Sequence, residues 1–402
     1  MLRILTTTDT AAVDAIVAQD AARDPRVVRA ARRIVAAVRA RGDEALIAYA
    51  RRLDGLRGPL EVSPDEILAA AARVPGDVRR AIQLAVRNAD RVARRQVPKP
   101  FSVEPTRGVV VEQRVTPLDR VGCYVPGGRS ALPSSLIMSV VPARAAGVNE
   151  VIVVCAKPED AVCAAFVESG ATRLFRIGGA QAIAALAYGT DTVPAVQRVT
   201  GPGNAYVAAA KAMVSADCPI DFNAGPSEIV VISDNGNPAW IAADLLAQAE
   251  HDADARAILI TTRRALAGKV AALLQGRGFV ILARNRAEAV GLVNRIAPEH
   301  AVCDDAGTAA ALTTAGTIFV GPWSAQAAGD YTTGSNHILP TGGAARFRGG
   351  LSAADFVKIT SVQTLTATGF RAIAPAAIAL ARVEGLPAHA ESMRLRLEGA
   401  RG

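Results

Sequence analysis

Residues 151–183 read VIVVCAKPEDAVCAAFVESGATRLFRIGGAQAI. Two short apolar runs, 151–155 and 173–177, each lead into a segment with helical spacing, 160–168 and 180–187. Strands that alternate with helices indicate βαβ units, in which parallel strands are joined by covering helices. This part of the chain therefore predicts a parallel sheet.

The same alternation extends in both directions along the chain. The further segments expected before residue 201 are 108–111, 120–125, 134–146 and 197–200. After residue 227 the alternation restarts, and the expected segments are 228–232, 238–249, 257–261, 263–274, 279–283, 286–296 and 317–320. The sequence therefore predicts an α/β fold with two Rossmann-like halves.

The two ends of the chain carry a different pattern. Residues 1 to 97 are predicted to be helical, because apolar residues recur three and four positions apart and Pro25 suits a first helical turn. After Pro340, glycine-rich turns lead into a tail predicted to be helical that contains His389. A functional residue in such a tail must fold back onto the body or reach a second subunit.

Composition limits the classes of protein that remain. With 50% apolar, 20% charged and only 4% aromatic residues, the chain has a soluble globular composition and lacks the aromatic platforms of many nucleic-acid binders. The net charge of +8 is spread over short arginine groups typical of solvated helix faces, although it could attract an anionic cofactor. Five cysteines without a CxxC pair, and no long apolar run, predict a cytoplasmic protein without a membrane span or signal peptide.

Each of the four histidines stands beside or near a carboxylate. The four groups are Gln248-Ala249-Glu250-His251, Glu299-His300, Asp330 with His337, and Glu384 with His389. A single pair of this kind is more often an ordinary hydrogen bond, but four of four favour a functional role. Gln248 and His251 are three apart, as metal ligands on one helix face are, and imidazoles with one carboxylate suit zinc.

Two further patterns suggest chemistry. Glu299 and His300 could act as general base and proton carrier, the alternative being a surface acid beside a buried histidine. Glycine turns at 126–128, 177–181 and 201–204 follow predicted strands and could present N–H groups to a phosphate. None completes a G-x-G-x-x-G motif, so tight turns that close a sheet are an equally good interpretation.

Several stretches share one order and spacing with a known family: YVPGG (124–128), IGGAQAIAALA (177–187), GPGNA (201–205), AGPSE (224–228), QAEH (248–251), APEH (297–300), and GDY (329–331) with NH (336–337). Together they resemble the histidinol dehydrogenase family over nearly the whole chain. The resemblance implies a homodimer of two incomplete Rossmann-like domains, with a C-terminal tail that completes the partner's active site. It also implies oxidation of L-histidinol to L-histidine through the aldehyde, with two NAD molecules reduced in turn.

The resemblance also implies roles for individual residues. It assigns zinc to Gln248, His251, Asp330 and His389, with His389 from the partner, and NAD contacts to Tyr124, Gln181 and Asn204. The implied substrate contacts are Ser227, Gln248, His251, His300, Asp330, His337, Glu384 and His389. Glu299 would activate the water that hydrates the aldehyde, and His300 would move protons in both oxidations.

The implied domains are an N-terminal helical arm (1–20), a discontinuous zinc and substrate domain (21–123 and 232–351), an NAD domain (124–231) and a helical tail (352–402). Three features depart from the expected pattern, and one of them, a segment 268–280 shorter than the usual connection, is expected to change only a surface loop. Gln326 stands where we expect Glu, and Arg129-Ser130-Ala131 looks atypical. These departures leave open a relative that oxidises another polar alcohol, such as a sulfonated diol. A nucleic-acid-binding protein without catalysis is a third hypothesis, but it leaves the histidines unexplained.

Overall fold

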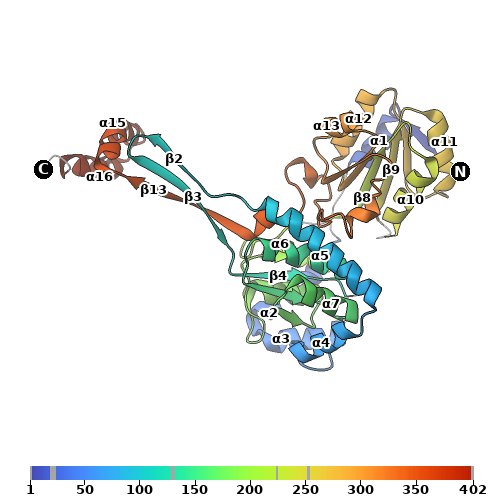
Figure 1. Ribbon diagram of the computed structural model, residues 1–402, viewed down its shortest axis with the longest axis horizontal. Coiled ribbons are helices and arrows are strands. Elements are labelled where there is room, and N and C mark those ends of the chain that lie inside the picture. Colours follow the sequence, from blue (N-terminus) through green and yellow to red (C-terminus); the bar gives the residue numbers. More distant parts are fainter. Residues whose placement is uncertain (1, 19–23, 128–131, 223–224, 251–253, 400–402) are drawn as a thin grey trace. The chain divides into compact units, whose positions relative to one another are not determined.

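The computed structural model describes residues 2–18, 24–127, 132–222, 225–250 and 254–399. The chain divides into two compact units: unit 1 comprises Met1–Gln96 and Asp119–Phe356, and unit 2 comprises Val97–Leu118 and Val357–Gly402. Unit 1 contains two parallel sheets covered by helices, which confirms the predicted α/β fold (Figure 1). Within the described ranges, no helix is both long enough and apolar enough to cross a membrane.

The first sheet of unit 1 has the strand order β6-β5-β4-β7, with all strands parallel. Its elements are β4 (Arg120–Tyr124), α6 (Pro133–Ala145), β5 (Glu150–Val154), α7 (Asp160–Ser169), β6 (Arg173–Phe175), α8 (Gly179–Tyr188), β7 (Val199–Thr200) and α9 (Ala205–Val214). The central strand β5 is buried along most of its length because helices cover both faces. The alternation predicted for residues 120–200 is confirmed.

The N-terminal helices pack on this first sheet. They are α2 (Pro25–Arg41), α3 (Asp43–Tyr49), a π-helical turn (Ala50–Asp54), α4 (Pro64–Ala72) and α5 (Gly76–Gln96). The apolar face of α2, which includes Ile34 and Val38, shares a core with Phe175 and Ile183. The expectation that residues 21–123 belong with 232–351 differs from this packing, because the small residues of α8 and α9 provide the surface that α2 covers.

The second sheet of unit 1 has the order β1-β10-β9-β8-β11-β12 and is also parallel. Its elements are β1 (Ile4–Thr6), α1 (Thr10–Val17), β8 (Glu228–Ile232), α10 (Pro238–Ala249), β9 (Arg256–Thr261), α11 (Arg264–Leu273), β10 (Phe279–Leu282), α12 (Arg286–Ile296), β11 (His300–Cys303), α13 (Ala306–Ala311), β12 (Thr317–Val320) and α14 (Gln326–Gly329). The chain proceeds outward from β8 to β10 and then resumes on the other side of β8 with β11, which is the doubly wound arrangement.

Two strands of this sheet were absent from the sequence prediction. Residues 4–6, predicted to be helical, form the edge strand β1, which pairs with β10. Residues 300–303 form β11 between β8 and β12. Each segment has only three or four residues, too few to show a periodicity, and each becomes a strand because it lies along a partner strand.

Unit 2 is a three-stranded antiparallel sheet with two helices. The sheet has the order β13-β3-β2, and its elements are β2 (Phe101–Thr106), β3 (Val109–Pro117), β13 (Val357–Leu365), α15 (Ala367–Val383) and α16 (Pro387–Gly399). The tail 352–402 was expected to be helical throughout, but β13 pairs with β3 along its whole length. Its sequence VKITSVQTL is rich in β-branched residues, which favour a strand.

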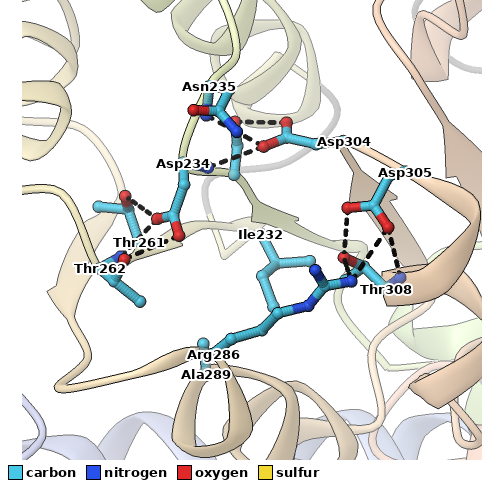
Figure 2. A pocket seen from close by; sticks show the side chains of 11 residues that line it. Ile232, Asp234, Asn235, Thr261, Thr262, Arg286, Ala289, Asp304, Asp305 and Thr308 are labelled. Carbon is cyan, nitrogen blue, oxygen red and sulfur yellow. Dashed lines mark hydrogen bonds and ion pairs between the residues drawn. The ribbon is translucent and has the colours of Figure 1, made fainter.

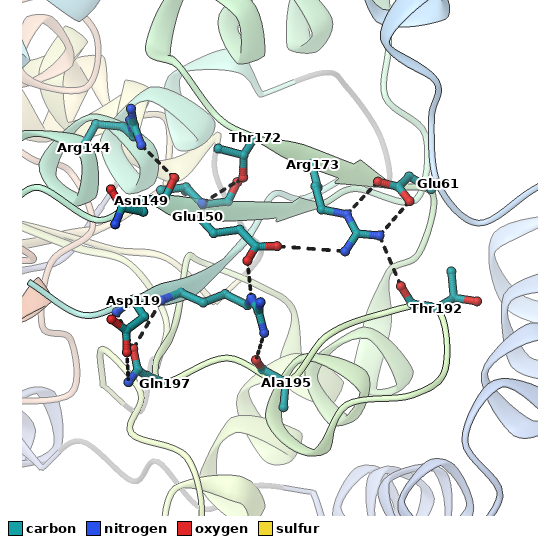
Figure 3. A network of polar contacts seen from close by, with 12 residues as sticks. Glu61, Asp119, Arg144, Asn149, Glu150, Thr172, Arg173, Thr192, Ala195 and Gln197 are labelled. Carbon is teal, nitrogen blue, oxygen red and sulfur yellow. Dashed lines mark hydrogen bonds and ion pairs between the residues drawn. The ribbon is translucent and has the colours of Figure 1, made fainter.

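A network of charged side chains ties β5 and β6 to the N-terminal segment (Figure 3). Arg173 binds both oxygens of Glu61 at 2.7 Å and lies 3.9 Å from Glu150. Its guanidinium lowers the pKa of Glu61, so the pair stabilises the fold above the usual titration range of glutamate and loses this contribution as the pH falls.

Removal of Arg173 is expected to destabilise the protein. Arg173→Met leaves the half-buried carboxylates of Glu61 and Glu150 without their shared cation, so we expect a loss of about 1 to 2 kcal/mol in the free energy of unfolding near pH 7. Urea denaturation followed by circular dichroism measures this loss. Arg94→Met, which removes an exposed pair with Asp90 on α5, is the control. Equal losses in the two variants would contradict the role of the network.

Candidate active site

The carboxyl end of the second sheet holds a pocket at the point where the strand order reverses, between β8 and β11 (Figure 2). This is the usual ligand position in doubly wound folds. Its carboxylates are already engaged: Asp234 accepts three hydrogen bonds from two threonines, Asp304 accepts the N–H groups of Asp234 and Asn235, and Asp305 pairs with Arg286 at 3.0 Å. These contacts bind the loops to one another and leave none of the three carboxylates available as a reactive group.

The predicted acid and imidazole residues lie at the opposite, amino end of this sheet. Ser227 directly precedes β8, Glu299 directly precedes β11, and Gln248 lies in the last turn of α10. We call the five residues of this group the acid–imidazole cluster: Ser227, Gln248, Glu299, His300 and Asp330. Apart from the adjacent Glu299 and His300, they come from segments far apart in the sequence.

A chain of hydrogen bonds fixes the carboxylate of Glu299. Gln248 Nε2 donates to Ser227 Oγ at 2.6 Å, and Ser227 Oγ donates to Glu299 Oε2 at 2.5 Å. The same oxygen accepts the backbone N–H of Glu228 at 3.0 Å. Glu299 is only 6% exposed, so these donors replace the water that would otherwise solvate its charge.

His300 is oriented by the neighbouring strand. Its Nδ1 lies 3.2 Å from the carbonyl oxygen of Glu228, to which it can only donate a proton. This contact selects the tautomer in which Nε2 is the basic nitrogen. Nε2 lies 3.9 Å from Asp330 Oδ1, and Nδ1 lies 3.7 Å from Glu299 Oε2. The imidazole therefore stands between two carboxylates and is 4% exposed.

Asp330 is held from two sides. Gln326 Nε2 donates to Asp330 Oδ2 at 2.9 Å, and the backbone oxygen of Asp330 lies 2.9 Å from His337 Nδ1. His337 Nε2 lies 3.5 Å from Ser135 Oγ on α6. Gln326 was noted in the sequence only as a departure from the expected Glu, and its contact with Asp330 was not predicted. The spacing of four residues was the available signal.

Two glutamine oxygens in this region lack a hydrogen-bond partner although they are buried. In both Gln248 and Gln326 the amide nitrogen is engaged, while Oε1 is buried without a partner. A buried acceptor left in this state costs about 1 to 3 kcal/mol unless a ligand satisfies it. Gln248 Oε1, which the resemblance assigns to zinc, thus fits a metal or substrate as its partner.

Of the four predicted zinc ligands, Gln248 and Asp330 belong to the acid–imidazole cluster. His251 lies outside the described residues, as does Arg129. Glu384 and His389 belong to unit 2, where Glu384 follows α15 and His389 lies in the first turn of α16, both exposed. Across the described ranges, no group of three His, Cys, Asp or Glu side chains could by itself hold a metal ion.

The predicted NAD residues lie at the carboxyl end of the first sheet. Tyr124 ends β4, and its hydroxyl oxygen accepts the backbone N–H of Gly179 at 3.2 Å. Gln181 Nε2 donates to Asp54 Oδ2 at 2.9 Å, and the same oxygen accepts the N–H of Gly178 at 3.1 Å. Burial raises the pKa of Asp54 and raises that of Tyr124 to about 12, so the phenol remains protonated at neutral pH.

These contacts limit the expected role of the glycine turn at 177–181. Two of its N–H groups, which could have bound a phosphate, are engaged instead: Gly178 donates to Asp54 and Gly179 donates to Tyr124. Asp54 could not be predicted from the sequence. It lies over 120 positions before Gly178, at the end of a π-helical turn, with no motif around it. Gln181 Oε1, however, is buried without a partner and remains a candidate contact for a ligand.

The third predicted NAD residue, Asn204, is exposed at the start of α9. Its side-chain oxygen accepts the N–H groups of Tyr206 and Val207 and so caps the helix. The N–H of Gly201 in the same turn is bound by Asp221 at 2.8 Å. The third turn, 126–128, ends outside the described residues. The turn that contains Asn204 is therefore held rigidly rather than left open.

Asp244 lies one helical turn before Gln248 on α10, and burial raises its pKa to about 6 from the usual 3.8. The folded state therefore binds this proton more tightly than the unfolded state does, and its stability falls as the pH rises between these two values. Because Asp244 is only half buried, solvent screening reduces the effect, and we expect Asp244→Asn to raise the free energy of unfolding by about 1 kcal/mol near pH 8.

At pH values below the usual titration range of aspartate, the same substitution should have little effect, since both forms are then neutral. Urea denaturation at the two pH values tests this difference. A gain of equal size at both would show that desolvation of the carboxylate is not the cause.

Comparison with known proteins extends the resemblance to whole chains. A sequence model of the histidinol dehydrogenase family matches residues 17–397. The histidinol dehydrogenase of Geobacter metallireducens is 46% identical over 395 residues, covering 91% of this chain and 91% of that protein. The histidinol dehydrogenase of Syntrophotalea carbinolica is 44% identical and covers 99% of this chain and 100% of its own length.

A solved structure leads to the same conclusion. The crystal structure of histidinol dehydrogenase from Elizabethkingia anophelis has a TM-score of 0.89 and 33% sequence identity, and it covers 95% of this chain and 94% of its own. Sequence and structure agree over nearly the full length, including both sheets and the tail. The chain therefore belongs to the histidinol dehydrogenase family.

Proposed function

We propose that this protein oxidises L-histidinol to L-histidine through L-histidinal, with two molecules of NAD as hydride acceptors and one zinc ion per subunit. The observation that carries the proposal is the buried Glu299 carboxylate, oriented by Ser227 and placed 3.7 Å from His300. Relatives named histidinol dehydrogenase, of which the match covers 91% and 100%, support the choice of substrate. An acid and an imidazole in contact provide the base and the proton carrier that such a reaction needs.

Zinc would be held by Gln248, His251, Asp330 and His389 of the partner subunit. When bound, zinc orients the amino alcohol through its nitrogen atoms and polarises its oxygen, without changing its own oxidation state. The buried Gln248 Oε1 and the oriented Asp330 carboxylate fit this role. NAD would contact Tyr124, Gln181 and Asn204, and the rigid turn at 201–204 supports that assignment.

His300 would take the proton of the histidinol hydroxyl group as a hydride passes to NAD from the carbon that carries this group, which gives the aldehyde. Glu299 would then remove a proton from water as the water oxygen adds to the aldehyde carbon, and His300 would return its proton to the carbonyl oxygen, which gives the hydrate. In the second oxidation His300 would take one hydroxyl proton from the hydrate as another hydride passes to NAD, which gives the carboxylic acid, and ionisation of the acid gives the carboxylate. Each oxidation therefore reduces one NAD and releases one proton, and ionisation of the acid releases a third proton.

The substrate would be enclosed by residues from both subunits. Ser227, Gln248, His251, His300, Asp330 and His337 would contact it from one chain, and Glu384 and His389 from the tail of the partner. A homodimer is supported by the apolar side chains that unit 2 exposes: Phe101, Val103, Ile359, Leu380 and Val383 are each 49–88% exposed. Five free, buried cysteines are compatible with a reducing cytoplasm.

The stoichiometry of the reaction tests this proposal. With zinc-loaded protein, excess NAD and limiting L-histidinol, we expect about two NADH per histidinol, because both oxidations occur at one site. One NADH per histidinol with release of the aldehyde would contradict the four-electron reaction. No turnover by a protein that binds zinc would point to another polar alcohol such as a sulfonated diol, which the named relatives do not favour.

A further inference from the structure

A lysine and an aspartate are buried together beside the turn at residues 201–204. Lys211 in α9 is 3% exposed and Asp221 is 1% exposed. Lys211 Nζ forms an ion pair with Asp221 Oδ1 and donates a hydrogen bond of 3.0 Å to the carbonyl oxygen of Gly201. Asp221 Oδ2 accepts the N–H of Gly201 at 2.8 Å. The pair therefore holds the peptide groups on both sides of one glycine.

Gly201 occupies a position that only glycine fits. Its φ is +112°, and a Cβ atom there would meet the carbonyl oxygen of Tyr124 at 2.0 Å. The backbone of the turn thus lies directly against the end of β4. Since Tyr124 is on one side of Gly201 and Asn204 lies three residues after it, the position of Gly201 sets the spacing between two proposed NAD contacts.

Stability alone does not account for this ion pair. Desolvation of two charges costs nearly as much as their attraction returns, and apolar side chains of similar size can be equally stabilising. What an apolar pair could not do is bind the N–H and C=O groups of Gly201 in fixed directions. Asp221 Oδ1 also accepts the N–H of Phe222 at 2.6 Å, so the carboxylate is itself held in place.

We propose that Lys211 and Asp221 are positioning residues for the dinucleotide: they fix the turn at 201–204 against Tyr124 so that NAD meets a preformed surface. This inference rests on the proposed function and adds residues outside the contacts assigned above. A preformed turn spares the cofactor the cost of ordering it, so loss of the pair weakens NAD binding more than histidinol binding.

The test replaces both charges at once, because a single substitution would bury an unpaired charge. Lys211→Met with Asp221→Asn keeps the side-chain volumes and leaves the site neutral. We expect the Kd for NADH, measured by its fluorescence, and the KM for NAD to rise about tenfold, while the KM for histidinol and the zinc content stay within about twofold. Circular dichroism and cooperative thermal unfolding establish that the variant is folded.

The matched control is Glu61→Gln with Arg173→Met. It removes an ion pair on β6 of the first sheet, at the opposite edge from β7 and the turn at 201–204. It should lower the melting temperature without changing the Kd for NADH by more than about twofold. A folded Lys211→Met, Asp221→Asn variant with a Kd for NADH within about twofold of the original protein would overturn the inference.

If the double variant does not fold, Lys211→Gln with Asp221→Asn takes its place. Glutamine is one atom shorter than lysine and cannot reach both partners, so the Kd for NADH should still rise by at least about threefold, and an unchanged Kd would overturn the inference. An original protein that binds NADH but does not oxidise histidinol would contradict the proposed function alone. An original protein that binds no NADH would contradict both.

Discussion

Glu299→Gln is expected to lower kcat for the oxidation of L-histidinal by about 1000-fold, since it removes the buried general base that is proposed to activate the attacking water. Ser227 Oγ and the N–H of Glu228 both donate to Glu299 Oε2. A glutamine can accept these same hydrogen bonds through Oε1, so the local structure should persist. The loss would then report on the base and not on the fold.

The two half-reactions separate this role from a general loss of activity. With L-histidinol as substrate, the variant should still form the first NADH more readily than the second, because the first oxidation uses His300 as its proton acceptor. Rapid-mixing measurement of NADH formation, with either histidinol or histidinal supplied, gives the two rates. Glu168→Gln on α7 is the control. Equal losses in both steps would indicate that Glu299 acts by positioning His300.

The acid–imidazole cluster lies at the amino end of the second sheet, whereas the loops at the carboxyl end of this sheet bind one another. In a doubly wound sheet the ligand usually lies at the carboxyl ends of the strands, where the order reverses. Here Asp234, Asp304 and Asp305 bind the loops at that end to one another. The residues proposed to carry the reaction instead precede β8 and β11, and the carboxyl end of the first sheet, with Tyr124 and Asn204, is the proposed position of the dinucleotide.

The sequence predicted segments with a local pattern better than strands that depend on a distant partner strand. Segment 151–183 is recognisable as β5, α7, β6 and α8 because its valine-rich runs and glycine turns are local features. β11 is not, because HAVC becomes a strand only between β8 and β12. β13 was missed as well, since its partner β3 lies over 240 positions upstream.

The candidate site was also predictable only where its residues stand out locally in the sequence. Adjacent residues such as Glu299 and His300 stand out in a sequence, and the structure also brings Ser227, Gln248 and Asp330 to them. Residues that act through a tertiary contact gave no such signal. Asp54, which binds Gly178 and Gln181, and Asp221, which binds Gly201, lie in segments without a motif, and only the folded chain shows their role.

Asp330→Asn is expected to remove most of the bound zinc. Asp330 is the only carboxylate among the proposed ligands, so the substitution takes away the charge that partly neutralises the ion and leaves a weak amide donor. We expect zinc affinity to fall by more than about 100-fold, with loss of histidinol oxidation. The amide oxygen of the introduced asparagine can still accept the hydrogen bond from Gln326 Nε2, so the fold around α14 should remain intact.

Zinc per subunit after dialysis, measured by atomic emission, tests this prediction without reference to activity. Asp244→Asn is the matched control: it is the same substitution, on the helix that carries Gln248, at a carboxylate with no assigned ligand role, and it should retain its zinc. If Asp330→Asn also retains a full complement of zinc, the metal is held by Gln248 and the histidines without Asp330. The 3.9 Å approach of Asp330 to His300 Nε2 would then mark Asp330 as an electrostatic partner of the imidazole instead, and the pH dependence of kcat would move in this variant while its zinc content did not.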